Sequence, residues 1–144
     1  PGTCGTKHPW TVRDVPARLD ELRKGLSRLR SVAPDWDDDT YEDEVGRWAG
    51  RLSETWERIF SQEVVGPILA DGGQEVRPAM VKILPRFTEQ DDNEFQASYR
   101  RISGWATRHD KSATTNYVPP ELDILDQELA LVEKWYQRVR KYKN

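Results

Sequence analysis

The fold of this chain is decided by residues 121–142, ELDILDQELALVEKWYQRVRKY. Apolar side chains recur in this stretch at alternating steps of three and four residues, and Ile124, Leu131 and Trp135 flank the resulting stripe. The stripe consists of Leu122, Leu125, Leu129, Val132, Tyr136 and Val139. This spacing places one apolar face along an α-helix, so it predicts a long amphipathic helix that must pack against other elements.

The same spacing occurs near the start of the chain. The apolar positions there are Val15, Leu19, Leu22, Leu26, Leu29 and Ala33. Asp14 has the side chain of an N-cap, Pro16 suits a first turn, and Pro34 stops the pattern after Val32. These features predict a first helix that begins after Asp14 and ends near Val32.

Two further helices are expected between these segments. The second is capped by one of the aspartates at 37–39, extends to about Val65, and has the stripe Tyr41, Val45, Trp48, Leu52, Trp56 and Ile59. In the third, Thr88 and Asp91 form a capping pair, and the helix ends near His109. Its expected buried face is Phe95, Tyr99, Ile102 and Trp105.

Residues 64–87 break the helical pattern with prolines and a Gly72-Gly73 pair, so we expect an irregular connector there. A small hairpin that turns at 70–73 is the alternative, and Pro78 would keep it at an edge. The predicted fold is therefore all-α, a bundle of about four amphipathic helices. Residues 1–13 are expected to be a linker or tail, and residues 14–144 a single domain.

Length, net charge, cysteine count and hydropathy limit the kinds of protein this chain can be. With 144 residues the chain is long enough for one domain with its own core, and its net charge of −3 is too small to indicate a polyanion partner. Cys4 is the only cysteine, which excludes an internal disulfide and makes a cytoplasmic setting the simplest expectation. No stretch approaches the roughly 18 apolar residues of a membrane span. The opening PGTCGTKHPW lacks an initiator methionine, so we expect a part of something longer.

We interpret two charged segments of the sequence primarily as solvated helix ends. The acidic run from Asp35 to Glu44 suits a helix start and has no Gly-centred calcium loop, although metal or basic-partner binding is an alternative. For the basic end of the chain, the alternative is nucleic-acid contact. Its residues are Lys134, Arg138, Arg140, Lys141 and Lys143.

The best candidate site is the dense polar segment 99–111 together with the loop that follows it. On a helix Arg101, Trp105 and Arg108 share a face, where two guanidinium groups could hold a phosphate or a carboxylate beside an aromatic ring. The full set of candidate binding or docking residues is Arg100, Arg101, Trp105, Arg108, His109, Asp110 and Asn116. No catalytic residue and no metal ligand are assigned, because serine-hydrolase context and metal-type histidine spacing are lacking.

Three short motifs resemble the C-terminal region of bacterial AAA/ABC-type ATPases related to SMC and RecF-like proteins, the broad group that includes the PrrC and RloC anticodon nucleases. They are HPW at 8–10, RLSETWER at 51–58, and HDKSA at 109–113 followed by Asn116 and the Pro119-Pro120 pair. They follow the family's order along nearly the whole chain. Ser53 stands where the family has Arg, Arg108 where it has Gly, and Lys111 where it has Gln.

The resemblance implies an accessory domain that docks onto an upstream ATPase head or a partner effector nuclease. It implies a nucleic-acid-directed, phage-defence setting, with ATP and magnesium bound by the parent protein and no cofactor bound by this domain. We expect a monomer or homodimer that does not contact a membrane. The alternative is a metal-independent, HEPN-like ribonuclease that uses Arg101 and His109, although their eight-residue separation is longer than that class usually shows.

Overall fold

The computed structural model describes residues 10–106 and 118–144. Four long helices dominate this part of the chain: α1 (Val15–Val32), α2 (Asp38–Ile59), α4 (Glu89–Ala106) and α5 (Leu122–Val139). A four-residue helix, α3 (Ile83–Arg86), precedes α4, and single 3₁₀ turns occur at Trp10–Val12, Ala33–Asp35 and Pro78–Met80. A π-helical turn, Phe60–Val65, continues α2 to the end predicted for it. The all-α bundle is thus confirmed.

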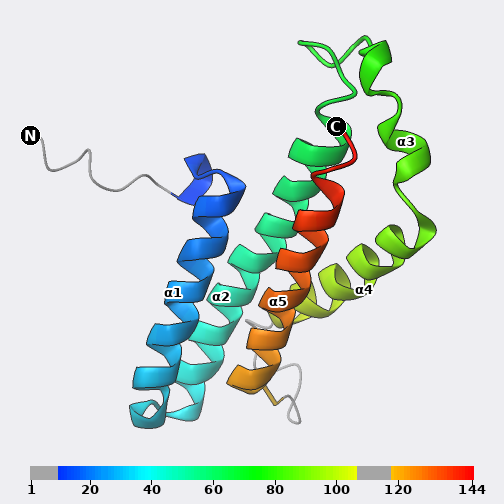
Figure 1. The fold of residues 1–144 in the computed structure, drawn as a ribbon. Coiled ribbons are helices and arrows are strands. Elements are labelled where there is room, and N and C mark those ends of the chain that lie inside the picture. The colour runs from blue at the N-terminus through cyan, green and yellow to red at the C-terminus, as the bar shows by residue number, and fades with distance from the viewer. Residues whose placement is uncertain (1–9, 107–117) are drawn as a thin grey trace, which may run out of the picture.

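Three of the long helices lie side by side, and the fourth crosses them. α1 and α2 form an antiparallel pair, α5 packs along α1, and α2 contacts α1, α4 and α5 (Figure 1). α4 runs obliquely behind this layer. Because α2 contacts all three other long helices, it is the central element of the fold.

The helix starts follow the predicted caps. Asp14 accepts a hydrogen bond from the Ala17 N–H at 2.9 Å, and Asp37 accepts one from the Thr40 N–H at 2.7 Å. Thr88 and Asp91 form a reciprocal capping box with distances of 3.0 and 3.1 Å. Each cap satisfies backbone donors that the first helical turn leaves free, a contribution of about 1 kcal/mol.

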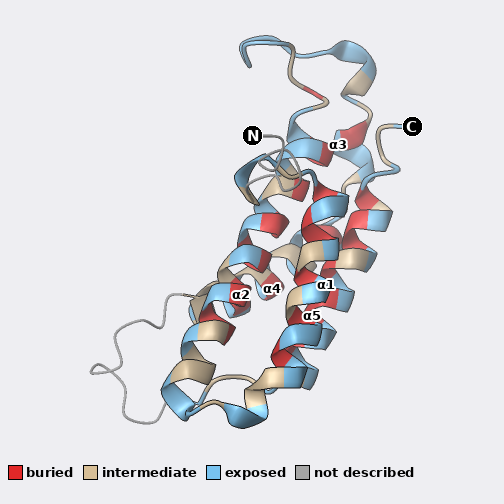
Figure 2. Cartoon of the chain, turned by 90° about the vertical axis from the view of Figure 1, so that its left-hand side faces the viewer, coloured by how far each residue is buried: buried red, intermediate tan, exposed pale blue. Residues whose placement is uncertain are grey.

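The core is built from the predicted stripes of α1, α2 and α5, whose buried side faces inward in Figure 2. Trp56 and Trp135 are each 1% exposed, with ring centroids 5.2 Å apart. Phe95 from α4 packs edge-on to Trp56 at 5.7 Å. On α4 only Ile102 of the predicted face is fully buried, whereas Phe95, Tyr99 and Trp105 are partly buried.

Small residues allow α4 to cross α2 closely. A Cβ atom at Gly46 would lie 3.4 Å from the Trp105 carbonyl oxygen, and one at Gly50 would lie 3.7 Å from the Ala106 Cβ. One turn further along, the Ser53 and Ser103 hydroxyls are 3.1 Å apart. The four-residue spacing of the two glycines is the sequence signal of this crossing, and the apolar periodicity did not reveal it.

Residues 66–86, called the arm below, project beyond the end of the bundle (Figures 1 and 2). The arm turns at Gly72 and Gly73, whose φ angles of 91° and 72° are readily adopted only without a Cβ. An antiparallel bridge between Leu69 and Val76 closes the turn. The connector therefore combines both expectations, a hairpin-like turn followed by irregular chain and α3.

Candidate functional site

The predicted docking cluster falls on the last turns of α4 and beyond. Arg100 is exposed and Trp105 is half-buried. Four members of the cluster lie outside the described residues: Arg108, His109, Asp110 and Asn116. The shared face proposed for Arg101, Trp105 and Arg108 is thus placed only for its first two members.

Arg101 joins α4 to α5. Its Nε and Nη2 donate to the two oxygens of Glu128 at 2.5 and 2.8 Å, and Nη2 also lies 3.3 Å from the Ser98 hydroxyl. Glu128 is 4% exposed, and its hydrogen bond raises the pKa of Arg101 above the ordinary value. The guanidinium is therefore held against the neighbouring helix. The ribonuclease alternative, which needs Arg101 and His109 together, stays a prediction.

The predicted basic end is divided by the fold. Arg138 donates to Asp91 at 2.8 Å and to Glu94, while Lys143 lies 2.7 Å from Glu63. Burial acts to lower the pKa of Arg138, but its hydrogen bonds to the two carboxylates outweigh this effect and the pKa is raised. The other three basic side chains are exposed: Lys134, Arg140 and Lys141.

Asp91 is a buried ion-pair centre that sequence reasoning identified only as a cap. It is 1% exposed and accepts hydrogen bonds from the Tyr142 hydroxyl at 2.6 Å, from Arg138 and from the Thr88 N–H. Burial favours the neutral acid, but these three donors together lower the pKa of Asp91. The Trp135 indole N–H also donates to the Asp91 carbonyl oxygen at 3.0 Å.

The last residues of the chain hold several elements together, and residues 138–144 are called the C-terminal clasp below. Besides Arg138 and Tyr142 on Asp91, and Lys143 on Glu63, the clasp binds α3. Arg86 Nη1 donates to the carbonyl oxygens of Tyr142 and Asn144 at 2.7 and 3.2 Å. The clasp therefore connects the end of α2, α3 and the start of α4.

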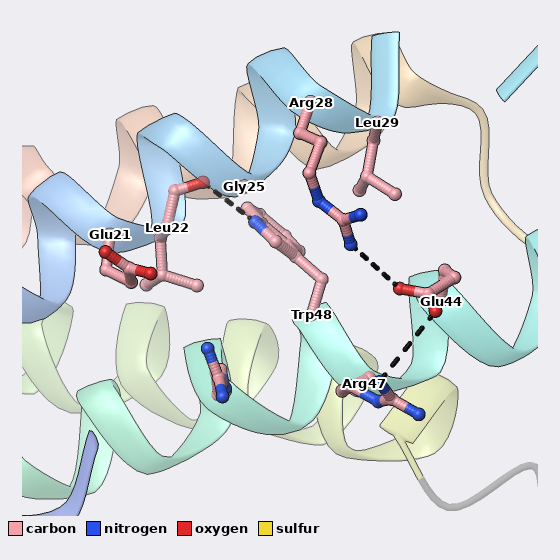
Figure 3. A pocket seen from close by; sticks show the side chains of 9 residues that line it. Glu21, Leu22, Gly25, Arg28, Leu29, Glu44, Arg47 and Trp48 are labelled. Carbon is pink, nitrogen blue, oxygen red and sulfur yellow. Dashed lines mark hydrogen bonds and ion pairs between the residues drawn. The ribbon is translucent and has the colours of Figure 1, made fainter. Parts of the chain in front are cut away.

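A groove of about 250 Å³ opens between α1 and α2. Its rim carries charged side chains and its floor is apolar, as Figure 3 shows. The lining residues are Glu21, Leu22, Gly25, Arg28, Leu29, Glu44, Arg47, Trp48 and Arg51. This α1–α2 groove has no counterpart in the sequence predictions, because its parts are individually ordinary helix residues.

Contacts on both sides fix the groove. Arg28 from α1 and Arg47 from α2 both reach Glu44, at 3.3 and 3.8 Å. The Trp48 indole N–H donates to the Leu22 carbonyl oxygen at 2.9 Å, which locks the ring between the helices. Gly25 lies beside this ring, where an added Cβ would be 3.3 Å from the Trp48 Cδ1.

The chain joins the bundle through Trp10. Its indole N–H donates to Glu54 at 2.5 Å, and the guanidinium groups of Arg18 and Arg51 lie 4.8 and 5.1 Å from the ring centroid. Arg18 is 4% exposed and donates to the carbonyl oxygens of Thr11 and Arg13. Burial, followed by the nearby charge of Arg58, lowers the pKa of Arg18. Part of the predicted linker 1–13 is thus packed on α1 and α2.

Within residues 10–106 and 118–144, the structure contains no cluster of three or more histidine, cysteine, aspartate or glutamate side chains suited to a metal ion. No helix in the same residues has the length and apolarity needed to cross a membrane. No protein-family model, curated protein or solved structure matches the chain.

Proposed function

We propose that this chain is an accessory interaction domain that docks onto the nucleotide-binding head of an SMC/ABC-type ATPase in a nucleic-acid-directed, phage-defence system. The three ordered motifs that resemble such ATPases support this assignment. ATP and magnesium would be bound by the head. The observation that carries the docking function is the set of exposed apolar side chains on the arm.

Exposed apolar side chains occur at four positions along the arm and at its base. Val76 and Leu84 are 57% and 58% exposed, and Val65 and Val81 are each 38% exposed. They make up half of the large apolar residues that are exposed in the described parts of the chain. Apolar side chains grouped on a projecting segment favour association, because a partner surface would remove them from water.

The position of Trp10 supports the head as the partner. α1 and α2 are antiparallel, so the start of α1 lies beside the end of α2, from which the arm projects. Arg58 near the end of α2 also donates to the Thr11 carbonyl oxygen at 2.9 Å. A head that precedes this domain would join it at the same end of the bundle as the arm.

The test measures calorimetric binding of this chain to the region that precedes it in its parent protein. Replacing Val76 and Leu84 together with serine should weaken binding by about tenfold, because two exposed apolar side chains no longer leave water. Leu131→Ser is the matched control, since Leu131 is 45% exposed on α5 and lies off the arm. Equal affinity of the double variant and wild type would contradict docking through the arm. A preceding region without a Walker A motif would remove the ATPase assignment.

A further inference from the structure

We propose that the α1–α2 groove is a second binding site, one that takes a short acidic peptide segment. Arg28 and Arg47 bind a carboxylate of this segment at the rim of the groove. The proposal concerns a different surface from the arm, so it stands or falls separately from docking to the ATPase head.

The charges of the groove favour an anion. Three arginines line it, whereas its two carboxylates are already engaged: Glu44 by Arg28 and Arg47, and Glu21 by Arg13 at 2.8 Å. Within the described residues Arg51 forms no ion pair, and its guanidinium faces the Trp10 ring. The groove therefore keeps more positive than negative charge.

Two of these arginines are placed at a cost to the helix. Arg47 and Arg51 are four residues apart on α2, where like charges destabilise a helix by a few tenths of a kcal/mol. Arg28 reaches the same rim from α1, and its side chain is 62% exposed. Guanidinium groups that converge from two helices can present parallel donors to one carboxylate.

Glu44 acts as an internal stand-in for the ligand. Its side chain is 22% exposed and touches both arginines, with contacts of 3.3 and 3.8 Å that are longer than those of a strong charge-assisted pair. An incoming carboxylate can therefore share or replace these contacts at little loss. Removing the negative charge of Glu44 should strengthen binding of an acidic ligand.

The size of the groove suits a few residues of peptide. Its α1 wall runs from Glu21 to Leu29, about 12 Å of helix, which matches roughly four residues of extended chain. The floor residues Leu22, Leu29 and Trp48 are only 1%, 2% and 6% exposed, so a bound segment would contact mainly the charged rim. A short acidic segment therefore complements the rim in both length and charge.

A nucleic acid fits the groove less well than a peptide. Glu21 and Glu44 lie on the rim, where they would repel the evenly spaced phosphates of a nucleic-acid backbone. The Trp48 ring is 6% exposed, so it offers no open face on which a base could stack. A single peptide carboxylate that takes over the Glu44 contacts with Arg28 and Arg47 meets neither obstacle.

The experiment uses fluorescence anisotropy with the full chain and a labelled short peptide of alternating glutamate and leucine. The reference peptide has glutamine in place of glutamate. Saturable binding of the acidic peptide is expected, and the Arg28→Gln, Arg47→Gln double variant should weaken it by about tenfold. Lys24→Gln, on α1 outside the groove and 71% exposed, should bind like wild type. Glu44→Gln should bind about threefold more tightly.

Chemical shifts give a second readout, in which the Gly25 amide and Trp48 indole N–H signals should move on titration with the acidic peptide. Equal binding of both peptides, no binding, or unchanged affinity of the double arginine variant would overturn the proposal. Weaker binding by Glu44→Gln would overturn it too. Tighter binding of single-stranded RNA than of the peptide, lost in the double variant, would assign the groove to nucleic acid instead.

Discussion

Asp91 shows how one buried carboxylate can set the pH response of the domain. Hydrogen bonds from Tyr142, Arg138 and Thr88 lower its pKa below the ordinary value. A group whose pKa is lower in the folded than in the unfolded state stabilises the fold above the unfolded pKa of about 3.9. That contribution is lost as the pH falls through the pKa of the folded state.

We therefore expect Asp91→Asn to lose about 2 kcal/mol of unfolding free energy at pH 7. The difference from wild type should shrink as the pH falls below about 4, because the wild-type carboxylate is then protonated as well. Urea unfolding at pH values from about 2 to about 8 measures this, because that range extends to both sides of the carboxylate pKa values of about 4. Asp92→Asn, exposed on the same turn, is the control. A difference that does not depend on pH would contradict the ion-pair role.

At this scale the sequence predicts local contacts better than distant ones. The capping roles of Asp14 and Asp91 follow from residues within three positions, so they could be predicted. The pairs of Arg101 with Glu128 and of Arg138 with Asp91 join residues 27 and 47 positions apart. Only the packing of α4 on α5 brings these side chains together. The sequence alone therefore indicated that all the basic residues at the end of the chain are exposed to solvent.

Among the elements, the π-helical turn after α2 depends on Gly66. The Gly66 N–H donates to the Ser61 carbonyl oxygen at 2.7 Å, five residues earlier, and a Cβ at Gly66 would lie 2.6 Å from that oxygen. The Ser61 carbonyl oxygen belongs to the backbone, so it cannot move away from an added Cβ as the end of a flexible side chain could. We expect Gly66→Ala to destabilise the fold by about 1–3 kcal/mol.

Gly50→Ala is the matched comparison, because a Cβ there makes ordinary contact with Ala106 at 3.7 Å. Alanine is the better helix former by about 1 kcal/mol, so this variant should melt at or above the wild-type temperature. Thermal unfolding followed by circular dichroism compares the melting temperatures of Gly66→Ala and Gly50→Ala. A Gly66→Ala protein as stable as wild type would show that the turn can relax without loss.

Helix positions were predictable because apolar periodicity is a property of each segment alone. The stripes of α1, α2 and α5 became the core except at Ala33, Tyr41 and Leu122, near helix ends, which are partly buried. The oblique course of α4 was not predicted, since it depends on how closely Gly46 lets the α4 backbone approach. The α1–α2 groove could not be predicted from the sequence either, because it forms only when α1 and α2 pack and bring Arg28 and Arg47 to the same rim.

For the whole molecule, the C-terminal clasp couples parts that are distant in sequence. Removing residues 141–144 takes away Tyr142 and Lys143 and leaves Glu63, which is 3% exposed, without its cation. The loss should be about 3 kcal/mol, because a buried charge is left uncompensated. Amide hydrogen exchange should speed up most in residues 60–68 and 83–95.

Residues 22–48, in the α1–α2 hairpin, should keep most of their protection because the clasp does not touch them. Lys141→Ser is the control, since the Lys141 side chain is exposed. Faster exchange spread evenly over all helices would mean that the clasp adds only general stability. Enhancement confined to the two named segments would show that it fastens the base of the arm.

The Trp10 attachment has a mechanical consequence. The Trp10 indole is hydrogen-bonded to Glu54 on α2, and the guanidinium groups of Arg18 on α1 and Arg51 on α2 pack on its ring. A pulling force applied to the chain before Trp10 is therefore transmitted to both helices. These contacts should resist unwinding of the first turn of α1. The arm projects from the same end of the bundle (Figure 1), so a force applied there is transmitted close to the base of the arm.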